Sequence, residues 1–148
     1  MASVLFQLYS SGKAALITDN PGKINWKDDT IVAVLLKPTY VFNPANTTWA
    51  DIVAHQITDA NYSPIVVTGK TCGLIGEKVR WSANTLKFGD AVTISAKTVV
   101  LLKRSGAALA AADQLICAAD LNSAASDAVV SSTTNLFQIT LTNGLFDI

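Results

Sequence analysis

The sequence predicts a mainly β protein, an antiparallel β-sandwich of roughly seven to nine strands with one short helix and an extended N-terminal segment. The first observation is two short, continuous apolar runs, Ile31–Leu36 and, within Thr98–Lys103, Val99–Leu102. The second is that clusters of Gly, Pro, Asn and Asp recur at roughly ten-residue spacing, which is typical of sandwiches and barrels. Together they indicate one sandwich domain over residues 1–148.

The run Ile31–Leu36 is the centre of the predicted core. Asp28 and Asp29 precede it and Pro38 follows it, so it is too short for a helix and is typical of a strand buried on both faces. Thr98–Lys103 has the same length and a basic residue, Lys103, at the end where Lys37 follows the first run. We therefore expect these two strands to lie side by side.

The N-terminal residues alternate between apolar runs and breaks. Residues 4–9 are typical of a strand or an extended arm, 10–12 are expected to break it, and 14–18 are expected to form a second extended piece. Residues 1–23 are accordingly expected to be an extended arm or an edge strand of the sandwich, and an arm of this kind could lie across a neighbouring subunit.

One segment has the pattern of a helix. Thr47 or Thr48 can serve as the N-cap, and Asp51 falls in the first turn, where the helix dipole favours an acidic residue. Apolar residues recur at helical spacing after the cap, at Trp49, Ile52 and Val53. This predicts a short helix of about two turns over residues 49–57.

The remaining segments predict further strands. Residues 64–68 open with a proline and are expected at a sheet edge, whereas three glycines in 69–76 indicate a loop. Strands are also expected at 78–81, 84–88, 92–102, 114–121 and 137–141, with a turn at Gly89-Asp90. Asn143-Gly144 is the strongest hairpin signal and predicts a short return strand over 145–148.

Composition favours association over enzymatic or nucleic-acid functions. The chain is 50% hydrophobic and 15% charged with a formal net charge of zero, against a typical charged fraction of about 25%. We expect a homo-oligomer or an assembled state, with a well-packed monomer as the alternative. Without a basic stripe, no nucleic-acid partner is expected. No apolar run approaches the ~20 residues of a membrane span, and the N-terminus lacks the basic start of a secretion signal.

The sequence predicts no catalytic, cofactor-binding or metal site, and the chain is not expected to be an enzyme. Cys72 and Cys117 follow no metal or redox spacing and are expected to be free, buried thiols, with a disulfide as the alternative. His55 is the only histidine and has no partner motif, so a structural or surface role is expected. Asp28 and Asp29 are only a weak pattern for a cation site.

Several segments in order resemble a family of small virion structural proteins of tailed bacteriophages, of the capsid decoration, cement or head-fibre type. The resemblance covers about residues 5–142 and rests on residues 28–36, Tyr40, Asn43-Pro44, 49–52, 54–57, Asn61-Tyr62, 79–82 and Thr98–Lys103. It implies a non-enzymatic β-sandwich that binds the major capsid protein and stabilises the head, in a virion assembled in the host cytoplasm.

With this resemblance, apolar residues near the N-terminus and in the loop after the central strand become candidates for an interface with the capsid protein or a sister subunit. Aromatic anchors are usual at interface centres. The candidates are Val4, Leu5, Phe6, Leu8, Tyr9, Tyr40, Phe42 and Trp49. Alternatives are a tail, neck or fibre-attachment component, or a host-glycan-binding module that stacks sugars on exposed Trp49, Trp81 or Tyr40.

Overall fold

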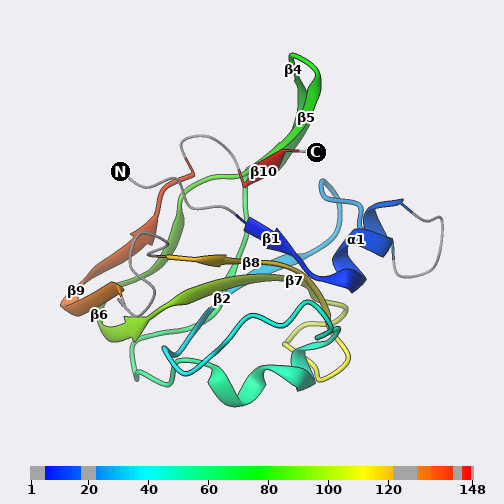
Figure 1. The fold of residues 1–148 in the computed structure, drawn as a ribbon. Coiled ribbons are helices and arrows are strands. Elements are labelled where there is room, and N and C mark those ends of the chain that lie inside the picture. Colours follow the sequence, from blue (N-terminus) through cyan, green and yellow to red (C-terminus); the bar gives the residue numbers. More distant parts are fainter. Residues whose placement is uncertain (1–5, 18–22, 122–129, 142–144, 148) are drawn as a thin grey trace.

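The computed structural model describes residues 6–17, 23–121, 130–141 and 145–147. The described residues form an antiparallel β-sandwich with three sheets, as predicted from the sequence (Figure 1). The strands are β1 (Phe6–Leu8), β2 (Ile31–Leu36), β3 (Ile65–Val66), β4 (Thr71–Ile75), β5 (Lys78–Ser82), β6 (Leu86–Ala96), β7 (Thr98–Lys103), β8 (Gln114–Asp120), β9 (Val130–Ile139) and β10 (Phe146–Asp147). The helical elements are α1 (Ser10–Ile17) and the 3-10 helices η1 (Trp49–Asp51) and η2 (Val53–His55).

The largest sheet has the strand order β1-β8-β7-β2-β3. β2 pairs with β7 along its whole length, from Ile31 opposite Lys103 to Leu36 opposite Thr98. All six residues of β2 are buried, which confirms the predicted central strand and its predicted partner. β3 lies at the edge of this sheet, as the proline before it indicated.

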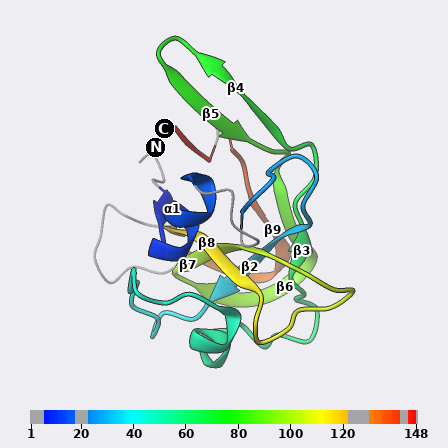
Figure 2. The same cartoon turned by 90° about the vertical axis from the view of Figure 1, so that its right-hand side faces the viewer.

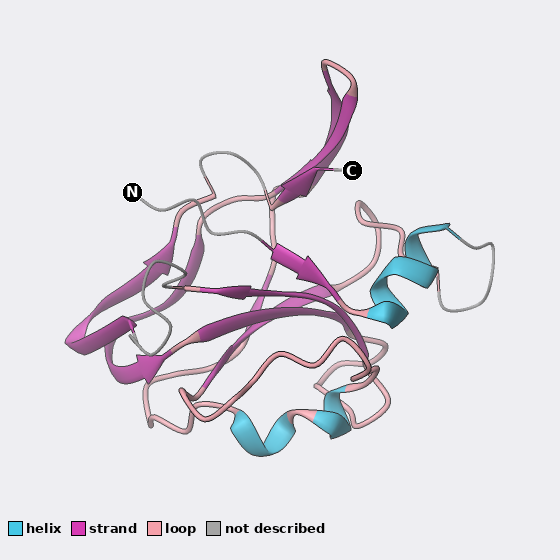
Figure 3. Cartoon of the chain, viewed as in Figure 1, coloured by secondary structure: helices cyan, strands magenta, loops and turns pink. Residues whose placement is uncertain are grey.

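Side chains of β2 enter two separate cores because successive residues of a strand point to opposite faces. Ile31, Ala33 and Leu35 pack in a core with apolar residues of β6 and β9. Val32, Val34 and Leu36 point to the other face, where they pack against Tyr40 and the segment that contains the two 3-10 helices. These helices lie below the sheet in Figure 3. A second sheet covers one face of β2, and a loop with helical turns covers the other.

The predicted continuous strand 92–102 is divided between two sheets. β6 pairs with β9, β7 belongs to the large sheet, and Lys97 alone separates them. The turn predicted at Gly89-Asp90 is instead an irregularity within β6, where the register with β9 shifts. Gly89 has φ +150, and a Cβ there would lie 2.6 Å from the side chain of Val92. Glycine therefore bends the strand here without ending it.

The N-terminal segment differs from the prediction. β1 is an edge strand paired with β8, but residues expected to break and extend form the helix α1. α1 packs against β8 so closely that a Cβ on Gly12 would lie 2.1 Å from the backbone oxygen of Ile116. Gly12 thus permits a close approach and does not act as a breaker. Residues 1–5 and 18–22 of the predicted arm lie outside the described residues.

The helix predicted over 49–57 exists as two 3-10 helices, so its position is confirmed but its type is wrong. The predicted start holds: the Asp51 carboxylate accepts hydrogen bonds from the backbone N–H groups of Thr47 at 2.8 Å and Thr48 at 2.9 Å. Ile52 separates η1 from η2 with φ −128 and ψ −5, outside helical geometry. Its side chain is fully buried, so packing on the sheet overrides helix continuity.

The loop predicted over residues 69–76 is wrong. β4 lies within this range and pairs with β5 in a hairpin that turns at Gly76 (φ +62). This hairpin stands out from the body of the sandwich in two views at right angles (Figures 1 and 2). β10 pairs with β5 and not with β9. The hairpin turn predicted at Asn143-Gly144 lies outside the described residues.

Candidate functional site

The described residues contain no group of three or more His, Cys, Asp or Glu side chains placed to hold a metal ion. The same part of the chain contains no helix of the length and apolar character needed to cross a membrane. The remaining candidates for a site are single reactive groups, a cavity and exposed surfaces.

The histidine and the two cysteines occupy different environments. His55 is half-buried, with its Nδ1 3.3 Å from Oγ1 of Thr39 and its ring 5.4 Å from that of Tyr40. Cys117 is fully buried, and burial raises the pKa of its thiol, so it stays protonated at neutral pH. Cys72 is exposed on β4. Both thiols are free, as expected, although only Cys117 is buried.

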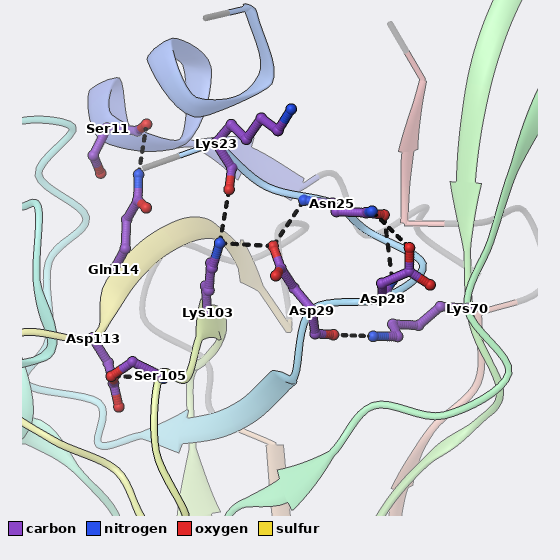
Figure 4. Close-up of polar contacts among 10 residues, drawn as sticks. All are labelled: Ser11, Lys23, Asn25, Asp28, Asp29, Lys70, Lys103, Ser105, Asp113 and Gln114. Atoms are coloured by element: carbon purple, nitrogen blue, oxygen red, sulfur yellow. Dashed lines mark hydrogen bonds and ion pairs between the residues drawn. The ribbon is translucent and has the colours of Figure 1, made fainter. Parts of the chain in front are cut away.

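Asp29 forms part of a polar cluster that holds the segment before β2 (Figure 4). Its Oδ2 lies 2.8 Å from Nζ of Lys103 and accepts the backbone N–H of Asn25 at 2.7 Å. The same Lys103 ammonium donates to the backbone oxygen of Lys23 at 2.8 Å. Lys70 donates to the backbone oxygen of Asp29, and partial burial lowers the pKa of its ammonium. The Asp29 carboxylate thus has a lysine partner, and the cluster fastens a loop to the sheet.

The structure brings Tyr9 of the N-terminal segment together with the candidate interface residues of the loop, but it places them inside the molecule. Tyr9, Tyr40 and Trp49 are 0%, 3% and 5% exposed and belong to the core under the large sheet. The hydroxyl groups of Tyr9 and Tyr40 lie 2.7 Å apart, and the ring of Phe42 is 4.9 Å from that of Tyr9. Burial and this hydrogen bond raise the pKa of Tyr9.

These rings pack against the protein's own sheet, so they offer little surface to another chain. Phe42 is half-buried against the same core. Phe6 and Leu8 are half-buried against the other core, and Val4 and Leu5 lie outside the described residues. The physical reason is that the loop must cover the second apolar face of β2, which leaves its aromatic residues little freedom to face outward.

The sugar-stacking surface proposed for Trp49, Trp81 and Tyr40 is absent, because Trp49 and Tyr40 lie in the core under the large sheet and Trp81 lies in the core on the other face of the sheet. All three tryptophans are buried, with Trp26 and Trp81 in edge-to-face contact at 5.1 Å between ring centroids. Stacking on a sugar needs an exposed ring face. The described structure therefore gives no support to a glycan site on these residues.

One open cavity of about 410 Å³ lies beside the edge strand β3. It is lined by apolar residues and by the two polar side chains of Gln56 and Arg104; the lining residues are Val32, Trp49, Gln56, Pro64, Ile65, Val66, Arg104 and Leu109. Nε of Arg104 is buried with no hydrogen-bond partner among the described residues. The lining includes no nucleophile and base pair, so the cavity could hold a small anionic or apolar group but does not indicate a reaction.

The projecting β4–β5 hairpin is the surface that the sequence analysis missed. Every residue of β4 is exposed, including two large apolar side chains, Leu74 at 77% and Ile75 at 54%. In the hairpin register Cys72 lies opposite Trp81 and Leu74 opposite Val79, so these four side chains share one face. That face runs from the core, at Trp81, to the exposed end of the hairpin.

A sequence signal for this hairpin exists. Apolar residues alternate on both sides of Gly76-Glu77, at positions 72, 74, 79 and 81. The glycine at 73 conceals the pattern because it resembles a loop residue.

Charged residues are distributed unevenly over the hairpin. β4 has no charged residue between Lys70 and Glu77, while β5 carries Lys78 and Arg80 on the face opposite Leu74. The surface can thus contact a partner through an apolar face, a cationic face and a free strand edge.

Comparison of the chain with protein-family models, with curated proteins and with solved structures found no match in any of the three.

Proposed function

We propose that this protein is a non-enzymatic virion structural protein, a capsid decoration or cement protein of a tailed bacteriophage that binds the major capsid protein and stabilises the head. The observation that carries this proposal is the projecting hairpin with its exposed apolar face. β10 pairs only with Trp81 and Arg80 of β5, so the outer part of the hairpin has two strands. A two-stranded hairpin is marginally stable in water, and an apolar face on it gains stability when another surface covers it.

The attachment surface is the face formed by Cys72, Leu74 and Val79. Leu74 is 77% exposed, so its burial in an interface would contribute about 1.5 kcal/mol or more per copy. A contribution of this size is small for one copy, but a capsid offers many equivalent sites. Binding at all of these sites stabilises the shell by mass action, because the protein binds the assembled capsid and not the free capsid subunits.

A tail, neck or fibre-attachment component would use the same kind of apolar arm, and it differs only in the particle that it binds. The binding test described below distinguishes the two. The glycan-binding alternative has lost the exposed rings on which it depended, because Trp49, Trp81 and Tyr40 are buried.

The test is binding to heads of the phage that encodes the protein, purified from a mutant lacking it. We expect the added protein to saturate the heads at a fixed ratio and to raise the temperature at which they release DNA. Measurement of bound protein by sedimentation and gel densitometry gives the ratio. Saturable binding to tails and none to heads would move the assignment to a tail component, and binding to neither would overturn the proposal.

A matched pair of variants locates the surface. Leu74→Ser should weaken head binding at least tenfold, since it removes the most exposed apolar side chain of the face. Val41→Ser serves as the control, because Val41 is 81% exposed on a different loop. Equal losses for the two variants would contradict the assignment of the hairpin as the attachment surface.

A further inference from the structure

We propose that β4 is an association edge through which two copies of this chain pair antiparallel, about a two-fold axis that passes between the two Gly73 residues. The two hairpins then form one continuous sheet. This inference goes beyond the capsid role and does not depend on it, because it concerns the purified protein in solution.

The first support is that one edge of β4 has no neighbour among the described strands. β4 is the last strand of its sheet and pairs only with β5. All five of its residues are exposed, and the hairpin stands clear of the sandwich in Figure 2. A strand edge of this kind presents a row of backbone N–H and C=O groups that can pair with another strand.

The second support is that β4 lacks the features with which proteins usually protect an edge. Those features are charged side chains, proline and bulges. Between Thr71 and Ile75 there is no charged residue and no proline, and the strand pairs with β5 without a register shift. An unprotected edge with exposed Leu74 is suited to strand pairing.

Charge identifies the occupant as a second copy. Pairing of β4 with itself places no like charges opposite each other, and the chain has a formal net charge of zero, so two copies do not repel. Lys70 precedes the strand and Glu77 follows it. In an antiparallel pair centred on Gly73, the Lys70 end of each copy lies beside the Glu77 end of the other.

Gly73 fits the position on the axis. A Cβ at Gly73 would have no atom within 4 Å, so the centre of the strand is open to an approaching backbone. In this register Gly73 lies opposite itself and Cys72 lies opposite Leu74 of the other copy. A two-fold axis perpendicular to the sheet also keeps both apolar faces on the same side. Cys72, Leu74 and Val79 of both copies then form one larger apolar surface.

Cysteine cross-linking tests the register directly. In a Cys72→Ser background, Gly73→Cys should give a disulfide-linked dimer under mild oxidation, because directly opposed residues have Cα atoms about 5 Å apart, within the range that a disulfide spans. Thr71→Cys in the same background is the control. Residue 71 would lie opposite Ile75 of the other copy, and the two residues at position 71 would be about 14 Å apart along the strands. This variant should therefore stay monomeric on a non-reducing gel. Cys117 is fully buried and does not interfere.

Charge at the same position tests the interface without oxidation. Gly73→Glu and Gly73→Lys each place like charges opposite each other, so each variant alone should be a monomer by sedimentation equilibrium at concentrations at which the unmodified protein is a dimer. An equimolar mixture of the two should restore the dimer. A monomeric unmodified protein, cross-linking that is equal at positions 71 and 73, or no restoration in the mixture would each overturn the proposal. A dimer that ignores phage heads would leave this inference intact and contradict only the capsid role.

Discussion

β2 and β4 are the two most instructive strands to compare. Both are short and uncharged, yet all six residues of β2 are buried and all five residues of β4 are exposed. β2 has a neighbour on each edge and a core on each face, whereas β4 has one neighbour and no core. The difference shows that β2 is covered on both edges and both faces, while the hairpin around β4 has an edge and a face that no other described residue covers.

The largest difference in stability is expected when leucine is replaced by alanine in each of the two strands. Leu35→Ala should lower the free energy of unfolding by about 2–5 kcal/mol, since Leu35 is fully buried and its loss leaves a cavity. Leu74→Ala should change it by less than about 0.5 kcal/mol, since Leu74 is 77% exposed. Urea unfolding of dilute protein measures both values.

If Leu74→Ala proved as destabilising as Leu35→Ala in dilute protein, the hairpin would be an integral part of the monomer core. In that case the comparison would fail. The exposed position of Leu74 would then have a different explanation from association.

Two glycines provide the next test. Gly12→Ala should lower the free energy of unfolding by about 1–3 kcal/mol, because its Cβ would lie 2.1 Å from the backbone oxygen of Ile116 and α1 must move away from β8. Gly73→Ala should have an effect within about 0.5 kcal/mol, because a Cβ there meets no atom within 4 Å. Thermal unfolding followed by circular dichroism compares the two variants. An equal loss of stability in both would show that the hairpin is as closely packed as the body.

The buried carboxylate of Asp113 should make the free energy of unfolding of the sandwich depend on pH. Asp113 is 1% exposed, and although burial alone would raise its pKa, hydrogen bonds from Ser105 and Ala110 hold that pKa below its usual range. A depressed pKa in the folded state stabilises the protein above the unfolded pKa of about 4, and this contribution is lost as the pH falls through the folded value.

Asp113→Asn should therefore lower the free energy of unfolding by about 2 kcal/mol at pH 7, and the difference from the unmodified protein should shrink below about pH 4. Urea unfolding at a series of pH values measures this difference. Asp90→Asn is the control, since its side chain is 89% exposed and should contribute little at any pH. A difference that is constant from pH 7 to pH 3 would contradict the role assigned to Asp113.

The smallest effect concerns the hydrogen bond between Tyr9 and Tyr40. Tyr40→Phe should cost about 1 kcal/mol, because it leaves the buried Tyr9 hydroxyl without its partner at 2.7 Å. Replacement of both tyrosines by phenylalanine should cost less than the sum of the single changes. Chemical denaturation of the four proteins in this cycle measures the coupling. Strict additivity would show that the two segments are not joined by this bond.

The sequence was sufficient to predict the parts of the fold that depend on burial. An unbroken apolar run predicted β2 and its partner β7 correctly, because strand length and flanking residues leave few other structures for such a run. Local signals failed where a tertiary contact decides the structure. Gly12 resembles a breaker in sequence, but its lack of a side chain permits the contact between α1 and β8.

The candidate interface was harder to predict than the fold. Aromatic residues such as Tyr40 and Trp49 are typical of both cores and interfaces, and composition cannot tell which face of the sheet needs covering. The hairpin was missed because Gly73 interrupts its alternation. Its exposure follows from the placement of other strands, which no local pattern records.

The central claim is that the sandwich around β2 is stable in a single copy of the chain, whereas the outer edge of β4 is covered only when two copies associate. Amide hydrogen exchange of the purified protein, measured at low and high protein concentration, is the most direct test of this claim. We predict that the amides of β2 exchange slowly at both concentrations. The amides of β4 that point away from β5 should exchange more slowly as the protein concentration rises. Fast exchange of β4 at every concentration, or exchange in dilute protein as slow as that of β2, would contradict the account.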